Sequence, residues 1–117
     1  MNKQQIVAII FDFDDTLGPD STSGLLNDCG IDVLQFWQEA AQLHLEHWDP
    51  VTAYLYKMIQ QAQSQASKCP ITKAKLCEWG QNVPLYPGVV EIFDDLKRRA
   101  RELSTDVALE FYIISSG

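Results

Sequence analysis

Two short, continuous apolar runs lie near the two ends of the chain, at Ile6–Phe11 and Leu109–Ile114. The first run is rich in β-branched residues, which favour strands. Uninterrupted apolar runs of this length are typical of parallel strands that are covered on both faces. We therefore expect two buried strands that belong to one parallel sheet.

Between these runs, apolar residues recur every three or four positions, which predicts amphipathic helices over residues 31–48, 50–66 and 72–81. Asp49 and Pro50 supply an N-cap and a first-turn proline for the second of these helices. The apolar face of the first helix is expected to carry Leu34, Trp37, Ala41, Leu45 and Trp48.

Gly, Pro and small polar residues mark where the helices begin and end. Residues 17–28 contain two glycines, a proline and three Ser or Thr residues, so we expect a loop there. Ser67–Pro70 is expected to end the second helix, and Pro84–Gly88 separates the third from a fourth. The inner face of this fourth helix is expected to carry Val89, Phe93, Leu96, Ala100 and Leu103.

The order of these elements predicts an α/β fold. Two strands and the fourth helix are the parts of a doubly wound, Rossmann-like core, and the other helices lie between them in the sequence. We expect residues 1–17 and 85–117 to form an incomplete core, and residues 18–84 to form an inserted helical domain.

Composition narrows the classes of function. The 117 residues carry a formal net charge of −7, which disfavours binding to the phosphate backbone of nucleic acids. No apolar run approaches the roughly 20 residues that a membrane span requires. The N-terminal residues show no signal-peptide pattern. We therefore expect a cytoplasmic protein without nucleic-acid or membrane partners.

The three cysteines, Cys29, Cys69 and Cys77, have irregular spacing, and a disulfide framework is not expected from an odd number. Two interpretations remain open. His44 and His47 lie three residues apart on a predicted helix and could form a zinc site with Cys69 and Cys77. Alternatively, the cysteines fill small gaps in the core and the two His lie on a helix face.

A basic cluster lies near the end of the fourth predicted helix, at Lys97, Arg98, Arg99 and Arg101. Cations at this end of a helix complement its dipole and are usually solvated, which is the simpler interpretation. The alternative is a site for a phosphate group or a partner protein.

The first strand ends in a pair of carboxylates, Asp12 and Asp14. Unpaired charges are costly to bury, so a bound metal ion and catalytic chemistry are the expected compensation. Mg²⁺ prefers oxygen ligands of this kind. One carboxylate can attack phosphorus while the other acts as general acid and base. Thr16 can orient Asp14, and Ser115 can donate a hydrogen bond to a phosphoryl oxygen.

Three segments together resemble the haloacid dehalogenase-like (HAD) superfamily. An apolar strand followed by Asp-x-Asp-x-Thr, here Asp12 to Thr16, resembles its first motif. Tyr86–Val89 and the helix after it resemble the stretch before the second motif, and Phe111–Ser115 resembles that second motif. Ser116 is a second option for the last position, although Ser115 fits the pattern better.

The resemblance implies a role for each matching residue. Asp12 is the nucleophile and a Mg²⁺ ligand through its carboxylate, while Asp14 is the general acid/base and a ligand through its backbone carbonyl. Family members that act as dehalogenases lack the second Asp, so Asp14 points to a phosphatase acting on a small phosphorylated metabolite. Asp15 stands where the family often has Gly, and we expect it in the turn rather than on the metal. The inserted helices correspond to a cap that closes the site.

The resemblance covers only the first half of the family pattern, because the Lys of the third motif and the acidic residues of the fourth would follow Gly117. We therefore expect a truncated and inactive fragment of a hydrolase. The alternative is a non-catalytic binding module that dimerises through exposed strand edges and presents its helices. Trp37, Trp48 and Trp79 on those helices are either core residues or part of such a surface.

Overall fold

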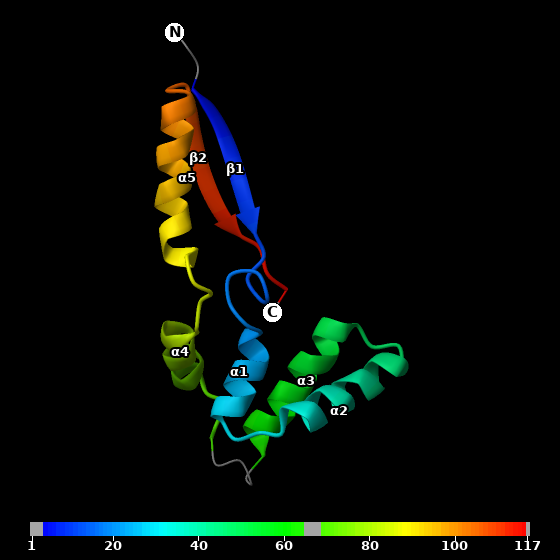
Figure 1. Ribbon diagram of the computed structural model, residues 1–117. Helices are drawn as coiled ribbons and strands as arrows, with labels where there is room; N and C mark the ends of the chain where they lie inside the picture. Colours follow the sequence, from blue (N-terminus) through cyan, green and yellow to red (C-terminus); the bar gives the residue numbers. More distant parts are fainter. Residues whose placement is uncertain (1–3, 65–68, 117) are drawn as a thin grey trace. The chain divides into compact units, whose positions relative to one another are not determined.

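The computed structural model describes residues 4–64 and 69–116. Within them the chain is a mixed α/β protein with five helices and a two-stranded parallel sheet (Figure 1). It divides into two compact units. Unit 1 consists of Met1–Pro19 and Pro84–Ser115, and most of unit 2 is Asp20–Val83.

Unit 1 is built on the two predicted strands. Strand β1 spans Gln5–Phe11 and β2 spans Val107–Ile113. They pair in parallel, with Gln5 opposite Val107 and Phe11 opposite Ile113. Helix α5, Val89–Leu103, precedes β2 in the sequence. The prediction of two parallel strands and of a helix after Gly88 is therefore confirmed.

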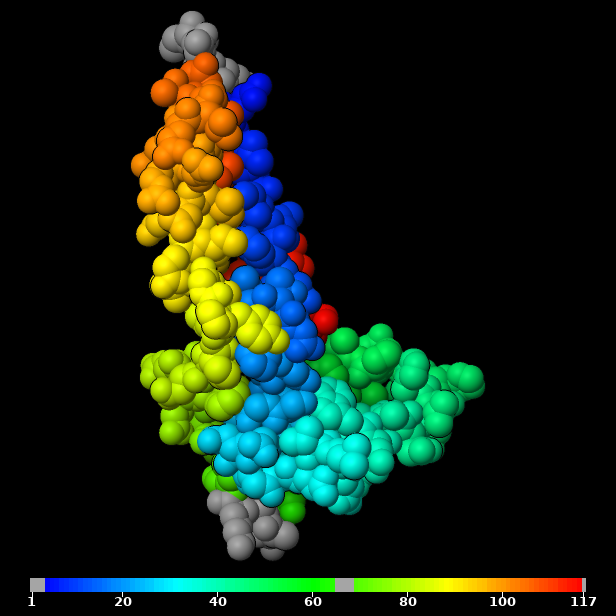
Figure 2. All heavy atoms as spheres, in the orientation of Figure 1, coloured from blue at the N-terminus to red at the C-terminus, as the bar shows by residue number. Residues whose placement is uncertain are grey.

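Helix α5 packs against β2 and so covers one face of the sheet, and Figure 2 shows its atoms, yellow to orange, beside those of β1 in blue. Phe93 on the helix contacts Phe11 and Phe111 edge-on, with ring centroids 5.7 and 5.1 Å away. Leu96 and Ala100 continue the half-buried stripe, as predicted. Leu103 does not, because the helix ends there at the turn into β2, and this side chain is 88% exposed.

The opposite face of the sheet is open among the described residues. Ile6 and Ile10 on β1 are 63% and 58% exposed, and Tyr112 on β2 is 49% exposed. The prediction of strands covered on both faces is therefore wrong for these residues. An apolar run shows that a strand can be buried, but the second covering layer must come from another element.

Unit 2 contains four helices: α1 (Ser21–Asp28), α2 (Val33–Leu45), α3 (Pro50–Gln63) and α4 (Lys73–Asn82). The predicted helices correspond to α2, α3 and α4. Asp49 caps α3 as expected, by accepting hydrogen bonds from the N–H groups of Val51 and Thr52. The break expected at Ser67–Pro70 falls partly outside the described residues.

The loop predicted over residues 17–28 is wrong from Ser21 onward, where α1 begins. Asp20 accepts hydrogen bonds from the N–H groups of Thr22 and Ser23, so the small polar residues form a cap rather than a loop. Leu25 and Leu26 on this helix are buried in the core, with 2% and 0% of their surface exposed.

The predicted apolar face of α2 is also wrong, except at Trp37, which is half-buried and packs against Tyr54 of α3. Phe36 and Ala40 are buried, whereas Leu34 and Leu45 are 70% and 71% exposed. The helix has apolar residues on more than one stripe, so periodicity alone does not show which stripe faces α3. Lys57 on α3 forms an ion pair with Glu39 on α2, with Nζ and Oε2 2.6 Å apart.

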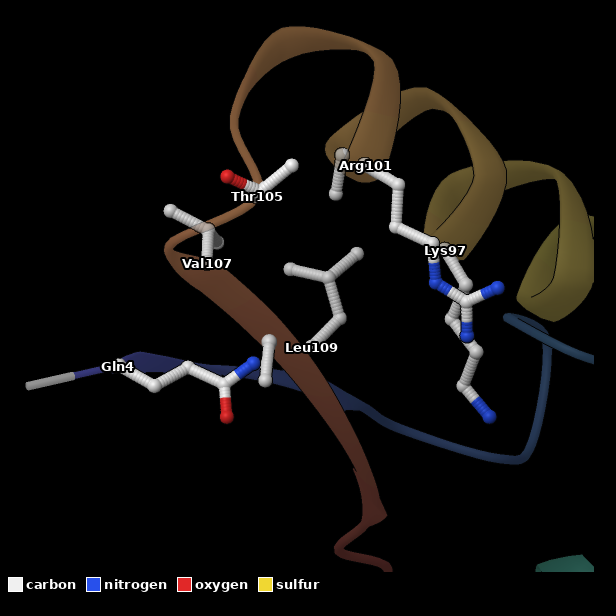
Figure 3. Close-up of a pocket in the computed structure, with 8 residues that line it drawn as sticks. Gln4, Lys97, Arg101, Thr105, Val107 and Leu109 are labelled. Atoms are coloured by element: carbon white, nitrogen blue, oxygen red, sulfur yellow. The ribbon is translucent and has the colours of Figure 1, made fainter. Parts of the chain in front are cut away.

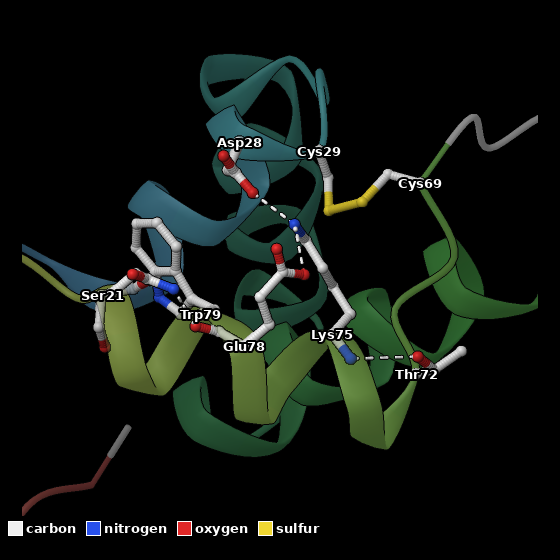
Figure 4. A network of polar contacts seen from close by, with 9 residues as sticks. Ser21, Asp28, Cys29, Cys69, Thr72, Lys75, Glu78 and Trp79 are labelled. Atoms are coloured by element: carbon white, nitrogen blue, oxygen red, sulfur yellow. Dashed lines mark hydrogen bonds and ion pairs between the residues drawn. A yellow bond between two sulfur atoms is a disulfide. The ribbon is translucent and has the colours of Figure 1, made fainter.

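The segment before α4 is joined to the end of α1 by a disulfide between Cys29 and Cys69 (Figure 4). The expectation of no disulfide is therefore wrong: the two Cα atoms, 40 residues apart in sequence, lie 5.0 Å apart in space. Cys77 is exposed with a free thiol. Among the described residues no group of His, Cys and carboxylate side chains is arranged to hold zinc.

Two further contacts join α1 to α4. Trp79 donates its indole N–H to the carbonyl of Ser21 at 3.0 Å. Lys75 forms an ion pair with Asp28 at 2.6 Å, as Figure 4 shows. None of the helices in the described ranges is both long and apolar enough to cross a bilayer.

Candidate functional site

The carboxyl edge of the sheet brings the two sequence motifs to one place in unit 1. Phe11 and Ile113 are the last paired residues, and the N–H of Ile114 donates to the carbonyl of Phe11 at 2.9 Å. Asp12 follows β1 directly, and Ser115 comes two residues after β2 ends. Parallel pairing in this register therefore places both residues at the same edge.

A tight loop follows Asp12 and fixes the backbone of the first motif. The carbonyl of Phe13 accepts hydrogen bonds from the N–H groups of Thr16 and Leu17, at 3.1 and 2.8 Å. The N–H of Asp15 donates to the carbonyl of Gly18 at 2.7 Å. Asp15 has a φ of 59°, in the left-handed region that Asp tolerates better than most residues. This agrees with the turn position expected for Asp15.

The loop is anchored from the segment that precedes α5. Leu17 is 4% exposed, and its carbonyl accepts a hydrogen bond from the N–H of Tyr86 at 2.8 Å. Gly18 lies so close to the backbone carbonyl of Pro84 that a Cβ at this position would clash with it. Residues 84–88, which the sequence indicated as a boundary and as part of the resemblance, therefore hold the motif loop in place.

The side chains differ in their surroundings. Those of Asp12, Thr16 and Ser115 are exposed, and Asp14 is half-buried. One carboxylate oxygen of Asp12 accepts a hydrogen bond from the N–H of Phe13 at 2.8 Å, which orients the group. The other oxygen has no protein hydrogen bond among the described residues. A carboxylate held in this way has an oxygen to offer to a cation or to phosphorus.

These residues fit a Mg²⁺ site of the common kind, in which one or two protein oxygens share the ion with water and substrate phosphate. Within the described residues, no three carboxylate, His or Cys side chains are arranged to hold a metal by themselves. The resemblance implies that the protein ligands would be the Asp12 carboxylate and the Asp14 backbone carbonyl. A site with so few protein ligands depends on the substrate for the rest.

A cavity of about 420 Å³ lies beside the motif loop, and Thr16 is the one predicted site residue that lines it. Tyr86, Glu91 and Asp95 also line it, and sequence reasoning did not single them out for a site. Asp95 forms an ion pair with Arg98 at 2.7 Å. The sequence signals in this region were the Pro87-Gly88 pair and the resemblance of Tyr86–Val89 to the stretch before the second motif, and neither indicated Glu91 or Asp95.

Comparison with known proteins finds no family model, no curated protein and no solved structure that matches this chain. The resemblance to the HAD superfamily consequently rests on the three short segments themselves: Asp12–Thr16, Tyr86–Val89 and Phe111–Ser115.

Proposed function

We propose that the chain belongs to a Mg²⁺-dependent phosphatase that hydrolyses a small phosphorylated metabolite through an aspartyl-phosphate. One observation carries the proposal: Asp12 and Ser115 follow adjacent parallel strands in register, at the edge where α/β folds bind their ligands. On this proposal unit 1 is part of a doubly wound HAD core, and unit 2 is a helical cap that selects the substrate.

The proposed reaction has two steps. The carboxylate oxygen of Asp12 attacks phosphorus and the bond to the leaving oxygen breaks, while Asp14 gives its proton to that oxygen. Asp14 then takes a proton from water, which attacks phosphorus and releases Asp12 and inorganic phosphate. Thr16 orients Asp14, and Ser115 donates a hydrogen bond to a phosphoryl oxygen. A bound Mg²⁺ would neutralise charge on the phosphate and on Asp12.

Replacing the proposed nucleophile tests this mechanism. In a full-length protein that carries the third and fourth motifs, Asp12→Asn is expected to lower Mg²⁺-dependent hydrolysis of a small phosphate ester at least about a thousand-fold, because a covalent step is lost. Asp15→Asn is the matched control: it removes the same charge three residues away, and Asn also tolerates a positive φ. Equal activity in the two variants would contradict the proposal.

A second readout does not depend on turnover. Incubation of that full-length protein with acetyl phosphate and Mg²⁺ is expected to add one phosphoryl group, and peptide mass spectrometry is expected to locate it on Asp12. The Asp12→Asn variant should stay unmodified, whereas the Asp15→Asn variant should be labelled as the parent protein is. Labelling at another residue would exclude Asp12 as the nucleophile.

The second candidate function is a non-catalytic module that binds through its own surfaces and forms a homodimer. The open face of the sheet favours it, since Ile6, Ile10 and Tyr112 are all about half exposed or more. Two strands also leave two edges without a partner among the described residues. The oligomeric state distinguishes this candidate from the phosphatase.

The compartment is a separate question. A cytoplasmic location is still a prediction from the sequence. The Cys29–Cys69 disulfide argues against it, because disulfides seldom persist in the reducing cytosol. Alkylation of the thiols in intact cells, followed by mass spectrometry, would show whether the pair is oxidised where the protein works.

A further inference from the structure

Unit 1 contains a second cavity, of about 430 Å³, between the end of α5 and the start of β2 (Figure 3). Lys97 and Arg101 on α5 line it, together with Gln4 and Thr105. Leu109 and Val107 supply an apolar wall. In the described part of the chain no carboxylate lines this cavity, although the whole protein has 16 acidic residues.

The four basic residues of α5 fall into two pairs with different surroundings. Arg98 and Arg99 form ion pairs on their own helix, with Asp95 at 2.7 Å and with Glu102 at 3.0 Å. Lys97 and Arg101 have no ion pair among the described residues, and these are the two that line the cavity. The helix dipole favours cations near this end of α5. It does not explain why two of the four cations form ion pairs while the other two line the cavity.

Lys97 and Arg101 are one helical turn apart and project from the same side of α5, as Figure 3 shows. The ammonium group of Lys97 lies 5.6 Å from the ring centroid of Phe111, which holds the side chain over the sheet. Gln4 and Thr105 add an amide and a hydroxyl that can donate hydrogen bonds. Two cations with neutral donors beside them form a site for a multiply charged oxyanion.

We propose that this cavity binds the phosphate group of a phosphorylated small molecule, whose organic part lies against Leu109 and Val107. The site is distinct from the candidate catalytic edge. It lies at the amino ends of β1 and β2, whereas Asp12 and Ser115 follow their carboxyl ends. Strands of seven residues rise about 3.3 Å per residue, so the two ends of the sheet lie roughly 20 Å apart.

Nuclear magnetic resonance titration with inorganic phosphate at low ionic strength tests the proposal. The backbone amides of Thr105, Val107 and Leu109 are expected to shift and to saturate. The double variant Lys97→Gln with Arg101→Gln is expected to bind at least about tenfold more weakly, since two charge-assisted hydrogen bonds are lost. All four cations are exposed, so the fold should persist, and far-ultraviolet circular dichroism checks it.

The matched control is Arg98→Gln with Arg99→Gln, which removes the same charge from the same helix. It should retain phosphate binding, because these side chains do not line the cavity. Absence of shifts around the cavity, or equal weakening in both double variants, would overturn the proposal. Phenyl phosphate should bind more tightly than inorganic phosphate, and equal affinity would overturn the role given to Leu109 and Val107.

The proposal is independent of the phosphatase mechanism. Phosphate bound at the catalytic edge would shift the amides of Asp12, Thr16 and Ser115 instead, and Asp12→Asn would alter those shifts alone. The two sets of amides come from opposite ends of the strands, so one titration reports each site separately.

Discussion

The indole of Trp79 packs against Gly24, and even one methyl group does not fit between them. A Cβ at Gly24 would lie 2.6 Å from Cζ2 of Trp79. The Gly24→Ala variant must therefore displace the indole and strain its hydrogen bond to the carbonyl of Ser21. Overpacking of this kind costs about 1–3 kcal/mol, and we expect a lower free energy of unfolding in urea.

Gly80 on α4 is the matched control for this variant, because a Cβ there meets no atom within 4 Å. Alanine gains up to about 1 kcal/mol of helix propensity over glycine at both positions. Gly80→Ala is therefore expected to raise the free energy of unfolding, and the difference between the two variants isolates the clash with Trp79. A Gly24→Ala protein as stable as Gly80→Ala would show that the indole moves aside freely.

At the scale of single residues, the sequence predicted those features that depend only on nearby residues or on strand pairing. Asp49 was predicted as an N-cap because an Asp-Pro pair identifies a helix start without reference to other elements, and its hydrogen bonds agree. Asp12 and Ser115 were placed at one sheet edge because parallel pairing requires it. The contacts of Gly18 with Pro84 and of Gly24 with Trp79 join residues more than 50 apart, and no local pattern predicts them.

At the scale of elements, the Cys29–Cys69 disulfide is the strongest link between α1 and the segment before α4. Closing a loop of 40 residues restricts the unfolded chain and stabilises the fold by about 2–4 kcal/mol. Cys29→Ser, or a reducing agent, should lower the urea midpoint accordingly. Cys77→Ser should leave it unchanged, since that thiol is free and exposed. Three alkylatable thiols in the native, unreduced protein would contradict the prediction.

The contact between α2 and α3 is expected to depend on pH. Hydrogen bonds from Lys57 and then Gln35, together with the charge of Lys57, hold the pKa of Glu39 below its ordinary value. Because the pKa of Glu39 is lowered in the folded protein, the ion pair stabilises the fold at pH values above the ordinary pKa of this group. This stabilisation is lost as the pH falls through the lower pKa of the folded state. Titration of the Glu39 carboxyl carbon by NMR should show the low pKa, and Lys57→Met should bring it back toward the ordinary value. An unchanged pKa in that variant would exclude the ion pair as the cause.

Elements with strong periodicity or clear caps were predicted from the sequence, and those that depend on a neighbour were not. α3 and α4 have such signals, and their bounds lie within a few residues of the prediction, while α5 begins after Gly88 as predicted. α1 was missed because its Ser and Thr residues are common to loops and caps, and only burial of Leu25 and Leu26 decides between them. The buried face of α2 could not be predicted either, because it depends on which of its apolar stripes packs against α3.

At the scale of the whole molecule, the two-stranded sheet has both outer edges and one face open among the described residues. The N–H of Gln5 donates to the carbonyl of Asp106, just before β2, and the carbonyl of Phe11 accepts from the N–H of Ile114, just after it, so both groups point toward β2. Alternation along the strand therefore turns the N–H groups of Ile6, Ala8 and Ile10 to the outer edge of β1. This edge can accept another strand without disturbing the sheet.

A second copy of the chain is the simplest partner for this edge, because identical strands can pair in antiparallel fashion about a two-fold axis. Pairing through β2 is less favourable, since Glu110 on its open face would meet its own copy. Pairing through β1 would bring the exposed Ile6 and Ile10 side chains of both copies together and bury them.

Light scattering during size-exclusion chromatography, over a range of concentrations, tests the β1-edge dimer. Ala8→Pro is expected to give a monomer at concentrations where the parent protein is dimeric, because proline removes an outward N–H and spares the bonds to β2. Ala8→Val is the control: it keeps the N–H and favours a strand, so the dimer should persist. A parent protein that is monomeric at every concentration would rule out edge pairing and, with it, the support that the dimer gives to a non-catalytic module.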